Sequence, residues 1–300
     1  MLSVLIPVYN WNVVPLVSEL YRQLENETIT FEIIVGDDAS EERYHLLNSV
    51  LEDKAFIRYI RFSENQGRSR LRNFLADQAS YPYLLYMDCD AAVISGSYIP
   101  HYVKTIREHA GEENFVIIGG TAYREGSPGS SNSLRWYYGR KREQKTSRER
   151  SKNPYRSFTP FNFVVTRSTF RTIRFDESLT TYGNEDTLYG YHLKVHRIKV
   201  LHIDNPLYHE GLDENEIYLM KIESAIDNLI RLSAGDSSES SFISDNRLLT
   251  TYRLLSKMHL AGPVKSLFGK YAPWMKRRLI KTPSLPLLDF YKLGYFLQHL

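Results

Sequence analysis

Apolar positions recur with two different periods along the first 120 residues. Short apolar runs, typical of buried strands, alternate with stretches in which apolar residues recur every three or four positions, as in amphipathic helices. The predicted strands are 3–8, 31–35, 57–62, 83–87 and 115–120, and the predicted helices are 13–24, 41–51, 68–79 and 98–109. Strands that alternate with helices form right-handed β-α-β units around a mostly parallel sheet. We therefore expect a doubly wound α/β structure over this half of the chain.

The pattern changes after residue 120. A Gly- and Ser-rich loop at 126–133 leads into a basic stretch, and residues 233–241 have the composition of a linker. The elements predicted in this part are strands at 160–167 and 199–203 and helices at 189–195 and 217–232. The last sixty residues are expected to be helical. The chain thus divides into 1–120, 121–232 and a C-terminal extension at 233–300.

Composition excludes several classes of protein. The 300 residues are 42% hydrophobic and 24% charged, which is typical of a folded globular chain. Cys89 is the single cysteine, so a disulfide scaffold is excluded, and no apolar run reaches the roughly 18 residues of a membrane span. The N-terminal apolar run is short, lacks a preceding basic region and ends at Asn10, so we interpret it as a strand rather than a signal peptide. A cytoplasmic location is expected.

Charge is unevenly distributed. The net charge of +3 does not by itself indicate nucleic-acid binding. Residues 135–156 include nine basic and two acidic side chains, and 261–300 include seven basic and one acidic, which favours anionic partners. The first segment is expected to meet an anionic ligand or to be a mobile, solvated loop. The second has the composition of a peripheral membrane-surface helix, although packing on the core or in a homodimer stays open.

Ligands of doubly wound sheets bind at the carboxyl ends of the strands, where this sequence has several carboxylates. Asp88 and Asp90 follow the strand at 83–87 and suit Mg²⁺ or Mn²⁺ with substrate phosphates, or form a solvated turn. Asp38 ends the second strand, where it can accept a hydrogen bond from an imide N–H or a ribose hydroxyl, or cap the next helix. Ser40 is expected to cap that helix in either case.

Three further segments carry candidate chemistry. Gly67 lets the backbone approach a ligand, and the arginines that follow it can meet phosphate or a base, unless this is an ordinary turn before a solvated helix face. Glu185 and Asp186 begin a predicted helix. Either they are there because the helix dipole favours acids in the first turn, or Asp186 acts as a general base. His209 is a candidate metal ligand, although a single histidine is more often structural.

In this order the segments resemble the family 2 glycosyltransferases, which have the GT-A fold. The resemblance spans about residues 1–215 and rests on SVLIPVYN, IIVGDDAS, ENQGRSRLRN, YLLYMDCD, YGNEDTLYG and the His209 segment. It implies a GT-A sheet with flanking helices, here followed by the C-terminal helical extension. Two positions depart from the family pattern: Ala39 stands where glycine is usual, and Cys89 lies inside the D-x-D motif. Neither identifies the sugar.

The resemblance also implies a role for each candidate residue. Asp186 would be the catalytic base with Glu185 as its neighbour, Asp90 and His209 would hold Mn²⁺ or Mg²⁺, and Asn162 would contact the acceptor. The positions expected to bind the nucleotide sugar are Pro7, Val8, Tyr9, Asp38, Gly67, Arg68 and Asp88. Residues 1–120 would then bind the donor, and 121–232 would form the acceptor side of the same domain.

The expected reaction is an inverting, metal-assisted transfer from a nucleotide-diphosphate sugar, with UDP expected, to a hydroxyl of a glycan or lipid-linked acceptor. A catalytically inactive nucleotide-binding module, or one that binds an anionic surface, is the alternative. A pyrophosphorylase is disfavoured because PVYNWN, which follows the first strand, has no glycine-rich phosphate loop. A nucleic-acid-binding module is disfavoured because the basic stretches contain no recognisable aromatic platform.

Overall fold

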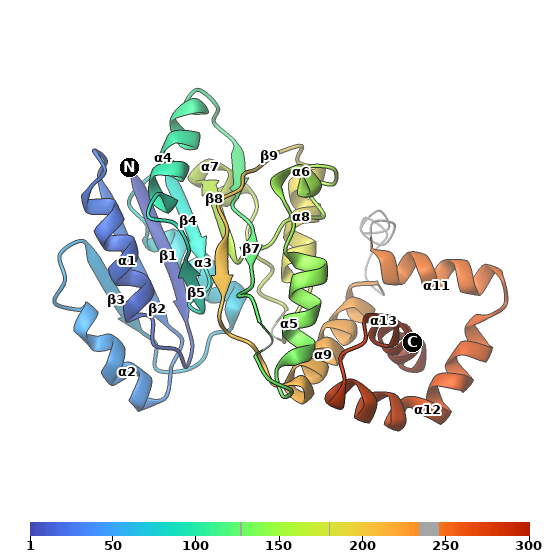
Figure 1. Ribbon diagram of the computed structural model, residues 1–300. Helices are drawn as coiled ribbons and strands as arrows, with labels where there is room; N and C mark the ends of the chain where they lie inside the picture. The colour runs from blue at the N-terminus through green and yellow to red at the C-terminus, as the bar shows by residue number, and fades with distance from the viewer. Residues whose placement is uncertain (127, 180, 234–245) are drawn as a thin grey trace. The chain divides into compact units, whose positions relative to one another are not determined.

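Figure 1 shows a computed structural model of the chain, which describes residues 1–126, 128–179, 181–233 and 246–300. The linker predicted at 233–241 lies, except for its first residue, outside these ranges. The chain forms two compact units. The first comprises Met1–Arg124, Gln144–Thr180 and Glu185–Gly211, and the second comprises Glu125–Glu143, Thr181–Asn184 and Leu212–Leu300.

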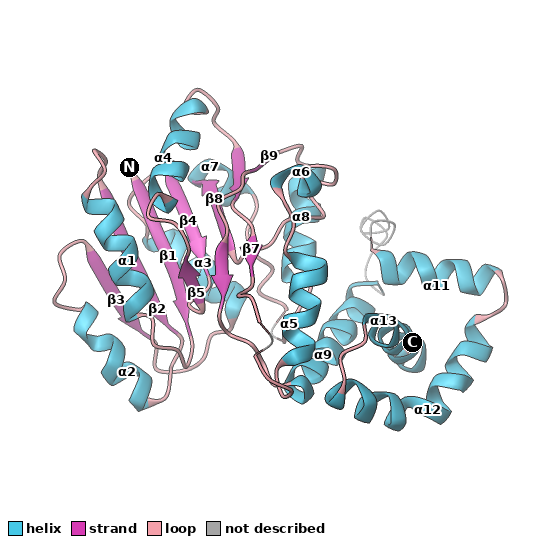
Figure 2. Ribbon diagram, viewed as in Figure 1, coloured by secondary structure: helices cyan, strands magenta, loops and turns pink. Residues whose placement is uncertain are grey.

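The first unit is built on a seven-stranded sheet with the strand order β3-β2-β1-β4-β8-β6-β9 (Figure 2). Its strands are β1 (Leu2–Val8), β2 (Phe31–Asp37), β3 (Ile57–Arg61), β4 (Tyr83–Met87), β6 (Phe115–Ile118), β8 (Asn162–Thr166) and β9 (Lys199–His202). All neighbours are parallel except β8, which runs antiparallel to both β4 and β6. From β1 the chain continues to β2 and β3 on one side, and β4 then lies on the other side of β1. Doubly wound sheets bind ligands at such a change of strand order. The predicted mostly parallel α/β class is confirmed.

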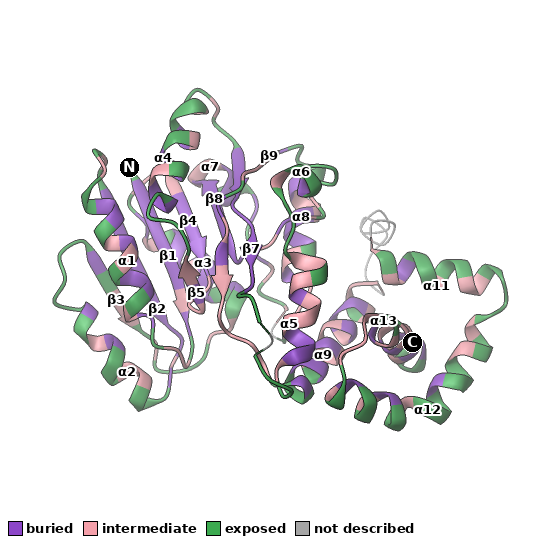
Figure 3. Ribbon diagram, viewed as in Figure 1, coloured by how far each residue is buried: buried purple, intermediate pink, exposed green. Residues whose placement is uncertain are grey.

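Helices pack on both faces of this sheet. They are α1 (Val14–Glu25), α2 (Glu42–Asn48), α3 (Arg68–Gln78), α4 (Tyr98–Glu108), α6 (Ser147–Arg150), α7 (Arg167–Thr172) and α8 (Glu185–Val195). Along β1, Val4 and Ile6 enter a core that includes α1 and α4, whereas Leu5 enters a second core that includes α3 and α8. Because both faces are covered, the central strands are buried along their length (Figure 3) and read as continuous apolar runs.

A second, three-stranded sheet was not predicted from the sequence. It consists of β5 (Ala91–Val93), β10 (Leu207–His209) and β7 (Thr121–Ala122), in that order. Strands of two or three residues are too short to show an alternating pattern. The antiparallel pairing of β10 with β5 sets His209 opposite Ala91, immediately after Asp90.

The basic segment at 135–156 is largely helical and not a loop, and most of its side chains are at least partly exposed. It contains the end of α5 (Ser133–Tyr138), a π-helix (Gly139–Glu143) and α6. Arg135 and Arg150 are buried. Arg150 donates to the carbonyl oxygens of Gly119 (3.2 Å) and Ile203 (2.6 Å), and burial lowers the pKa of its guanidinium. Part of this segment therefore has a structural role.

The second unit is helical. Besides α5 it contains α9 (Asn215–Ser233), α11 (Arg247–Lys257), α12 (Ala261–Lys281) and α13 (Leu285–His299). Glu223 of α9 accepts hydrogen bonds from Lys276 of α12 (3.1 Å) and Tyr291 of α13 (2.5 Å). At Gly294 an added Cβ would lie 2.1 Å from the Phe268 ring, so α12 and α13 pack closely. Among the described residues, no helix is both long enough and apolar enough to span a membrane.

Candidate functional site

Asp38 connects the ends of β1 and β2 to the start of α3. Its buried carboxylate accepts hydrogen bonds from the backbone N–H groups of Gln66 (2.6 Å) and Gly67 (3.1 Å), and its own N–H donates to the Val8 carbonyl (2.8 Å). Burial raises the pKa of Asp38, and the two backbone donors oppose this shift. Gly67 has φ +82°, which favours glycine. These contacts fix the predicted nucleotide-binding segments relative to one another.

The remaining predicted nucleotide contacts differ in exposure. Pro7 is partly buried, Val8 is buried, and Tyr9 is exposed over 54% of its surface. Arg68, the first residue of α3, is exposed.

The predicted helix cap at Ser40 is wrong. The α2 helix has no side-chain cap, and the Ser40 hydroxyl instead accepts the backbone N–H of Asn10 at 2.9 Å. The neighbouring acid, Asp37, is also engaged, because its carboxylate accepts from the Tyr59 hydroxyl and from the Ser40 N–H. Both side chains therefore stabilise the turn after β2 and leave the capping position to Glu41.

Arg72 joins the D-x-D motif to the segment that begins α8. Its guanidinium is 2% exposed and lies 2.8 Å from Asp88 Oδ1 through Nη2 and 3.7 Å from Glu185 Oε1 through Nη1. The Phe175 ring lies beneath it, 5.2 Å from the guanidinium carbon. The charge of this buried guanidinium is thus compensated by carboxylates from two different segments. Two motifs almost one hundred residues apart in sequence thus share one ion-pair network.

Asp186 lies next to this network in the first turn of α8. Its Oδ1 accepts hydrogen bonds from the Thr187 N–H (2.6 Å) and the Thr187 hydroxyl (3.2 Å). Burial, and secondly the negative charge of Glu185, raise the pKa of Asp186 to about 6. A carboxylate with a pKa closer to neutrality accepts a proton more readily than an ordinary aspartate and suits general-base catalysis.

Asp90 and His209 meet through the small sheet. His209 Nε2 lies 3.7 Å from Asp90 Oδ2, and the histidine ring stacks between Phe161 (5.1 Å) and Tyr123 (5.7 Å). A Cβ at Gly211 would lie 2.0 Å from Asp90 Oδ2, so glycine leaves room for this carboxylate. Both predicted metal ligands are therefore held side by side.

The chain supplies few further ligands at this place. In the part of the chain that the structure describes, there is no group of three or more His, Cys, Asp or Glu side chains arranged for a metal ion. An aspartate and a histidine nevertheless fit a cation that takes its remaining ligands from substrate phosphates and water, as Mg²⁺ commonly does.

Cys89, between the two aspartates, is an inert part of this turn. Burial, together with the negative charge of Asp90, raises the pKa of its thiol, and a backbone hydrogen bond from Tyr9 opposes this shift only in part. The thiol therefore stays protonated at neutral pH in the metal-free chain.

The structure corrects the prediction for Asn162, which has no solvent exposure. Its Oδ1 accepts from the hydroxyls of Tyr98 and Tyr102 (2.7 Å each), and its Nδ2 donates to the carbonyls of Gly120 (3.0 Å) and Asn205 (2.9 Å). All of its hydrogen-bonding groups are engaged inside the protein. Asn162 is therefore a structural residue and no acceptor contact.

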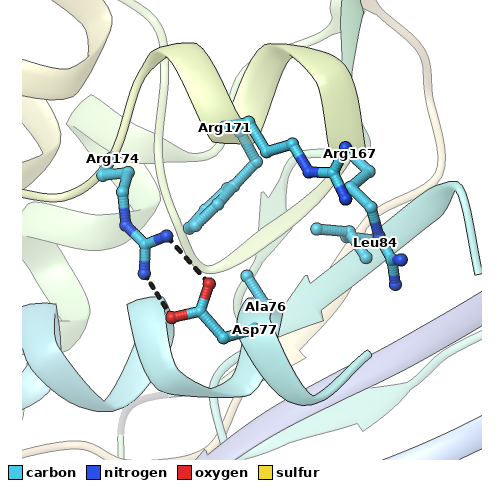
Figure 4. Close-up of a pocket in the computed structure, with 7 residues that line it drawn as sticks. Ala76, Asp77, Leu84, Arg167, Arg171 and Arg174 are labelled. Atoms are coloured by element: carbon cyan, nitrogen blue, oxygen red, sulfur yellow. Dashed lines mark hydrogen bonds and ion pairs between the residues drawn. The ribbon is translucent and has the colours of Figure 1, made fainter. Parts of the chain in front are cut away.

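A basic pocket lies toward the opposite end of β4 (Figure 4). Its volume is about 120 Å³, and it is lined by Ala76, Asp77, Leu84, Arg167, Phe170, Arg171 and Arg174. Arg174 donates two hydrogen bonds to Asp77, at 2.8 and 2.7 Å. Leu84 lies near the start of β4, whereas Asp88 follows its carboxyl end, so this pocket is separate from the predicted donor site.

Comparison with protein families identifies the class that this fold and these motifs define. The model of the family described as "Glycosyl transferase family 2" matches residues 3–174, more than half of the chain. The protein belongs to this family, and the resemblance inferred from its motifs is confirmed.

Two curated relatives illustrate the range of the family. A validoxylamine A glucosyltransferase of Streptomyces hygroscopicus subsp. limoneus is 28% identical over 228 residues, which are 66% of this chain and 49% of the relative. A GalNAc(5)-diNAcBac-PP-undecaprenol β-1,3-glucosyltransferase of Campylobacter jejuni is 24% identical over 275 residues, which are 87% of this chain and 85% of the relative. The chain thus spans about half the length of the first relative and most of the second.

Solved structures confirm the GT-A type fold. TarS 1–349 of S. aureus matches with a TM-score of 0.53 and 16% identity over 99% of this chain and 88% of TarS 1–349. The mannosyltransferase PcManGT of Pyrobaculum calidifontis, solved in complex with GDP-Man and Mn²⁺, matches with a TM-score of 0.53 and 14% identity over 99% of this chain and 84% of PcManGT. At these identities the likeness shows the fold alone.

Proposed function

We propose that this protein is an inverting glycosyltransferase that moves a sugar from a nucleotide-diphosphate donor to a hydroxyl group. The observation that carries the proposal is the network of Asp88, Arg72 and Glu185 beside Asp186, in a chain of family 2. This network lies at the carboxyl ends of the strands, where doubly wound folds bind nucleotides.

We propose UDP as the nucleotide. Asp38 sits at the junction of β1, β2 and α3 and can accept the imide N–H of uracil, beside the exposed Tyr9 and Arg68. Among the structural neighbours, TarS 1–349 was solved with UDP-GlcNAc, and PcManGT with GDP-Man. These neighbours support a nucleotide sugar as the class of donor, and Asp38 supports UDP within that class.

The metal proposed is Mn²⁺ or Mg²⁺, held by Asp90 and His209. Their 3.7 Å separation and the room left by Gly211 support this assignment, as does the Mn²⁺ in the PcManGT complex. When bound, such an ion offsets the negative charge that develops on the departing diphosphate. The leaving group then needs no carboxylic acid to protonate it, unlike the leaving group of a glycoside hydrolase.

Asp186 is proposed as the general base. It accepts the proton of the acceptor hydroxyl while the oxygen forms its bond to the anomeric carbon and the bond from that carbon to the diphosphate oxygen breaks. Attack from the face opposite the leaving group inverts the anomeric centre. Arg72 holds Glu185 in ion-pair contact, which limits the repulsion between the two neighbouring acids.

The proposed acceptor is a glycan or a lipid-linked glycan. The name of the Campylobacter relative describes an undecaprenol-pyrophosphate-linked substrate, and the chain aligns with most of that relative. A lipid-linked acceptor places the enzyme at the inner face of the membrane as a peripheral protein. We also carry over the division into a donor half at 1–120 and an acceptor half at 121–232 as part of this proposal.

Transfer assays test the proposal. The chain is incubated with Mn²⁺, a panel of UDP- and GDP-sugars and a mixture of soluble and isoprenoid-linked glycans, and nucleotide release and product mass are recorded. We expect acceptor-dependent release of UDP and a product with inverted anomeric configuration, read by NMR. A folded sample that releases no nucleotide with any donor would instead support the inactive, nucleotide-binding alternative.

A further inference from the structure

An apolar stripe runs along α12 from its N-cap residue, and all of its members except the half-buried Val264 are exposed. Leu260, Val264, Leu267, Tyr271 and Trp274 follow one another at spacings of four and three, which sets them on one side of the helix. Leu267 is 48% exposed and Trp274 is 54% exposed. Fifteen residues of helix extend about 21 Å at a rise of ~1.5 Å per residue. The stripe is therefore long enough to form a binding surface.

This stripe is distinct from the side of α12 that packs inside the second unit. The packed side consists of Phe268, Met275 and Leu279, which are buried. Phe268 packs against Tyr291 and lies close to Gly294, both of α13. Packing inside the second unit thus involves one side of α12, and the apolar stripe lies on another side.

A row of basic side chains runs beside the exposed stripe. Lys270, Arg277 and Lys281 are spaced seven and four residues apart, and all three are exposed. None of the three forms an ion pair within the described residues, whereas Lys276, on the packed side, pairs with Glu223. Residues 247–288 include nine Lys and Arg residues and no Asp or Glu. Within the described residues, these three cations therefore lie without an ion-pair partner in a helix that also exposes Leu, Tyr and Trp.

We infer that this surface, formed by the apolar stripe and the basic row of α12, binds an anionic lipid bilayer. Apolar side chains that enter the acyl boundary, with cations at the level of the phosphate headgroups, are the pattern of an interfacial helix. Tyrosine and tryptophan are enriched at that interface. The inference deepens the membrane location in the proposed function by assigning it to particular residues, and it does not depend on catalysis.

Charge disfavours a second copy of this chain as the occupant. A twofold dimer brings the same patch of both subunits together. Here it would bring two basic rows together with no acid from residues 247–288 to compensate them. An anionic bilayer complements the same charges, and burial of the apolar stripe adds to the attraction.

Vesicle flotation with the full chain tests the inference. Vesicles of phosphatidylcholine alone are compared with vesicles that also contain phosphatidylglycerol, at low and high salt. We expect binding to the anionic vesicles only, weakened by salt. The double variant Lys270→Gln, Arg277→Gln should have a partition coefficient roughly 25-fold lower, about fivefold per cation removed. The double variant Leu267→Ser, Trp274→Ser should have a partition coefficient lowered by more than about tenfold.

Two control double variants distinguish binding through this surface from non-specific binding to vesicles. The variant Arg148→Gln, Lys152→Gln lacks two exposed cations of the other basic segment. The variant Leu46→Ser, Val50→Ser lacks two exposed apolar side chains of the first unit. Both control pairs should bind as the unchanged chain does. The inference is overturned if the unchanged chain does not float with anionic vesicles, or if test and control pairs lose binding equally. It is also overturned if the Leu267/Trp274 pair instead abolishes a dimer seen in sedimentation.

A nucleotide melting assay on each variant keeps the two proposals apart. Every variant should retain the melting shift caused by UDP and Mn²⁺, since none changes a residue of the candidate site. Loss of vesicle binding with that shift intact bears on the lipid surface alone. Vesicle binding without any nucleotide response would leave the lipid surface standing and count against the proposed function.

Discussion

Arg72 is the residue on which the candidate site most depends. The sequence suggests a role for the arginines after Gly67 but does not distinguish Arg70, which is exposed, from Arg72, which is buried between two acids. That distinction arises from the fold, which brings Asp88 after β4 and Glu185 at the start of α8 to the same guanidinium.

Replacing Arg72→Met should destabilise the protein and weaken donor binding. Removal of one partner from a buried ion pair costs about 3–5 kcal/mol, because the other charge is left uncompensated. Asp88 keeps some exposure, so the lower end is expected. Thermal unfolding measures the loss, with Arg70→Met as the exposed control on the same helix. Equal melting temperatures for the two variants would contradict the network.

Replacing Asp186→Asn should abolish transfer while UDP binding persists. In the unchanged enzyme, the turnover rate should rise with pH and level off above about 6, because the base must be deprotonated and its pKa is raised to about 6. Measuring kcat against pH, and UDP affinity for the variant, checks both expectations. Near-normal turnover of the variant would contradict the assignment of the base.

The same substitution should stabilise the fold near neutral pH. Because the folded-state pKa of Asp186 lies above the unfolded value of about 3.9, its ionised form is less favourable in the folded protein. Asp186→Asn should therefore raise the melting temperature at pH 7, and the gain should vanish as the pH falls from about 6 to about 4. A gain that does not change with pH would show that ionisation is not its cause.

At the scale of elements, the three-stranded sheet decides where the proposed metal ligands meet. Replacing Gly211→Ala introduces a Cβ that would lie 2.0 Å from Asp90 Oδ2, so the carboxylate must move. We expect a strongly reduced affinity for Mn²⁺ in the presence of UDP, together with some fall in melting temperature, because the Cγ and Cβ atoms of Asp90 would lie 2.8 and 2.9 Å from the added Cβ. Gly96→Ala is the control, because nothing lies within 4 Å of its added Cβ. Unchanged metal affinity in the Gly211 variant would contradict the placement.

A substitution at Asn162 distinguishes a structural role of this residue from a role in acceptor binding. Replacing Asn162→Ala removes the hydrogen-bond partner of the Tyr98 hydroxyl and of the Asn205 carbonyl. The Tyr102 hydroxyl and the Gly120 carbonyl also lose a bond, but each keeps a longer one to the backbone, at 3.5 and 3.4 Å. Each buried unsatisfied group costs about 1–3 kcal/mol. The melting temperature should fall by several degrees while KM for the acceptor is unchanged, with the exposed Asn153→Ala as control. A raised KM with unchanged stability would restore the acceptor role.

Sequence predicted the long elements and missed the short ones. Buried strands such as β1 and β4, and amphipathic helices such as α1 and α4, have enough residues to show a period. The strands β5, β7 and β10 have two or three residues each, and their pairing is determined by tertiary contacts alone. The motifs could be found from their order along the chain. The contacts of Arg72 and the burial of Asn162 could not, since both depend on segments distant in sequence.

For the whole molecule, the division into two compact units separates the proposed roles. The candidate site lies in the first unit, and the exposed stripe of α12 lies in the second. The basic residues within 135–156 also differ in burial, since Arg150 is buried while Arg148 and Lys152 are exposed. Clustered charge in a sequence therefore does not indicate a single binding surface.

The most direct test of the central claim is a melting-temperature titration with UDP, with and without Mn²⁺, on the unchanged chain and on Asp90→Ala. Ligand at about 100 times Kd stabilises the folded state by roughly 2.7 kcal/mol, which raises the melting temperature by several degrees. We predict this rise for the unchanged chain with UDP and Mn²⁺ together, and its loss in Asp90→Ala. A folded chain whose melting temperature does not respond to UDP, or responds identically without Mn²⁺ and in Asp90→Ala, would contradict a metal-assisted nucleotide-sugar transferase.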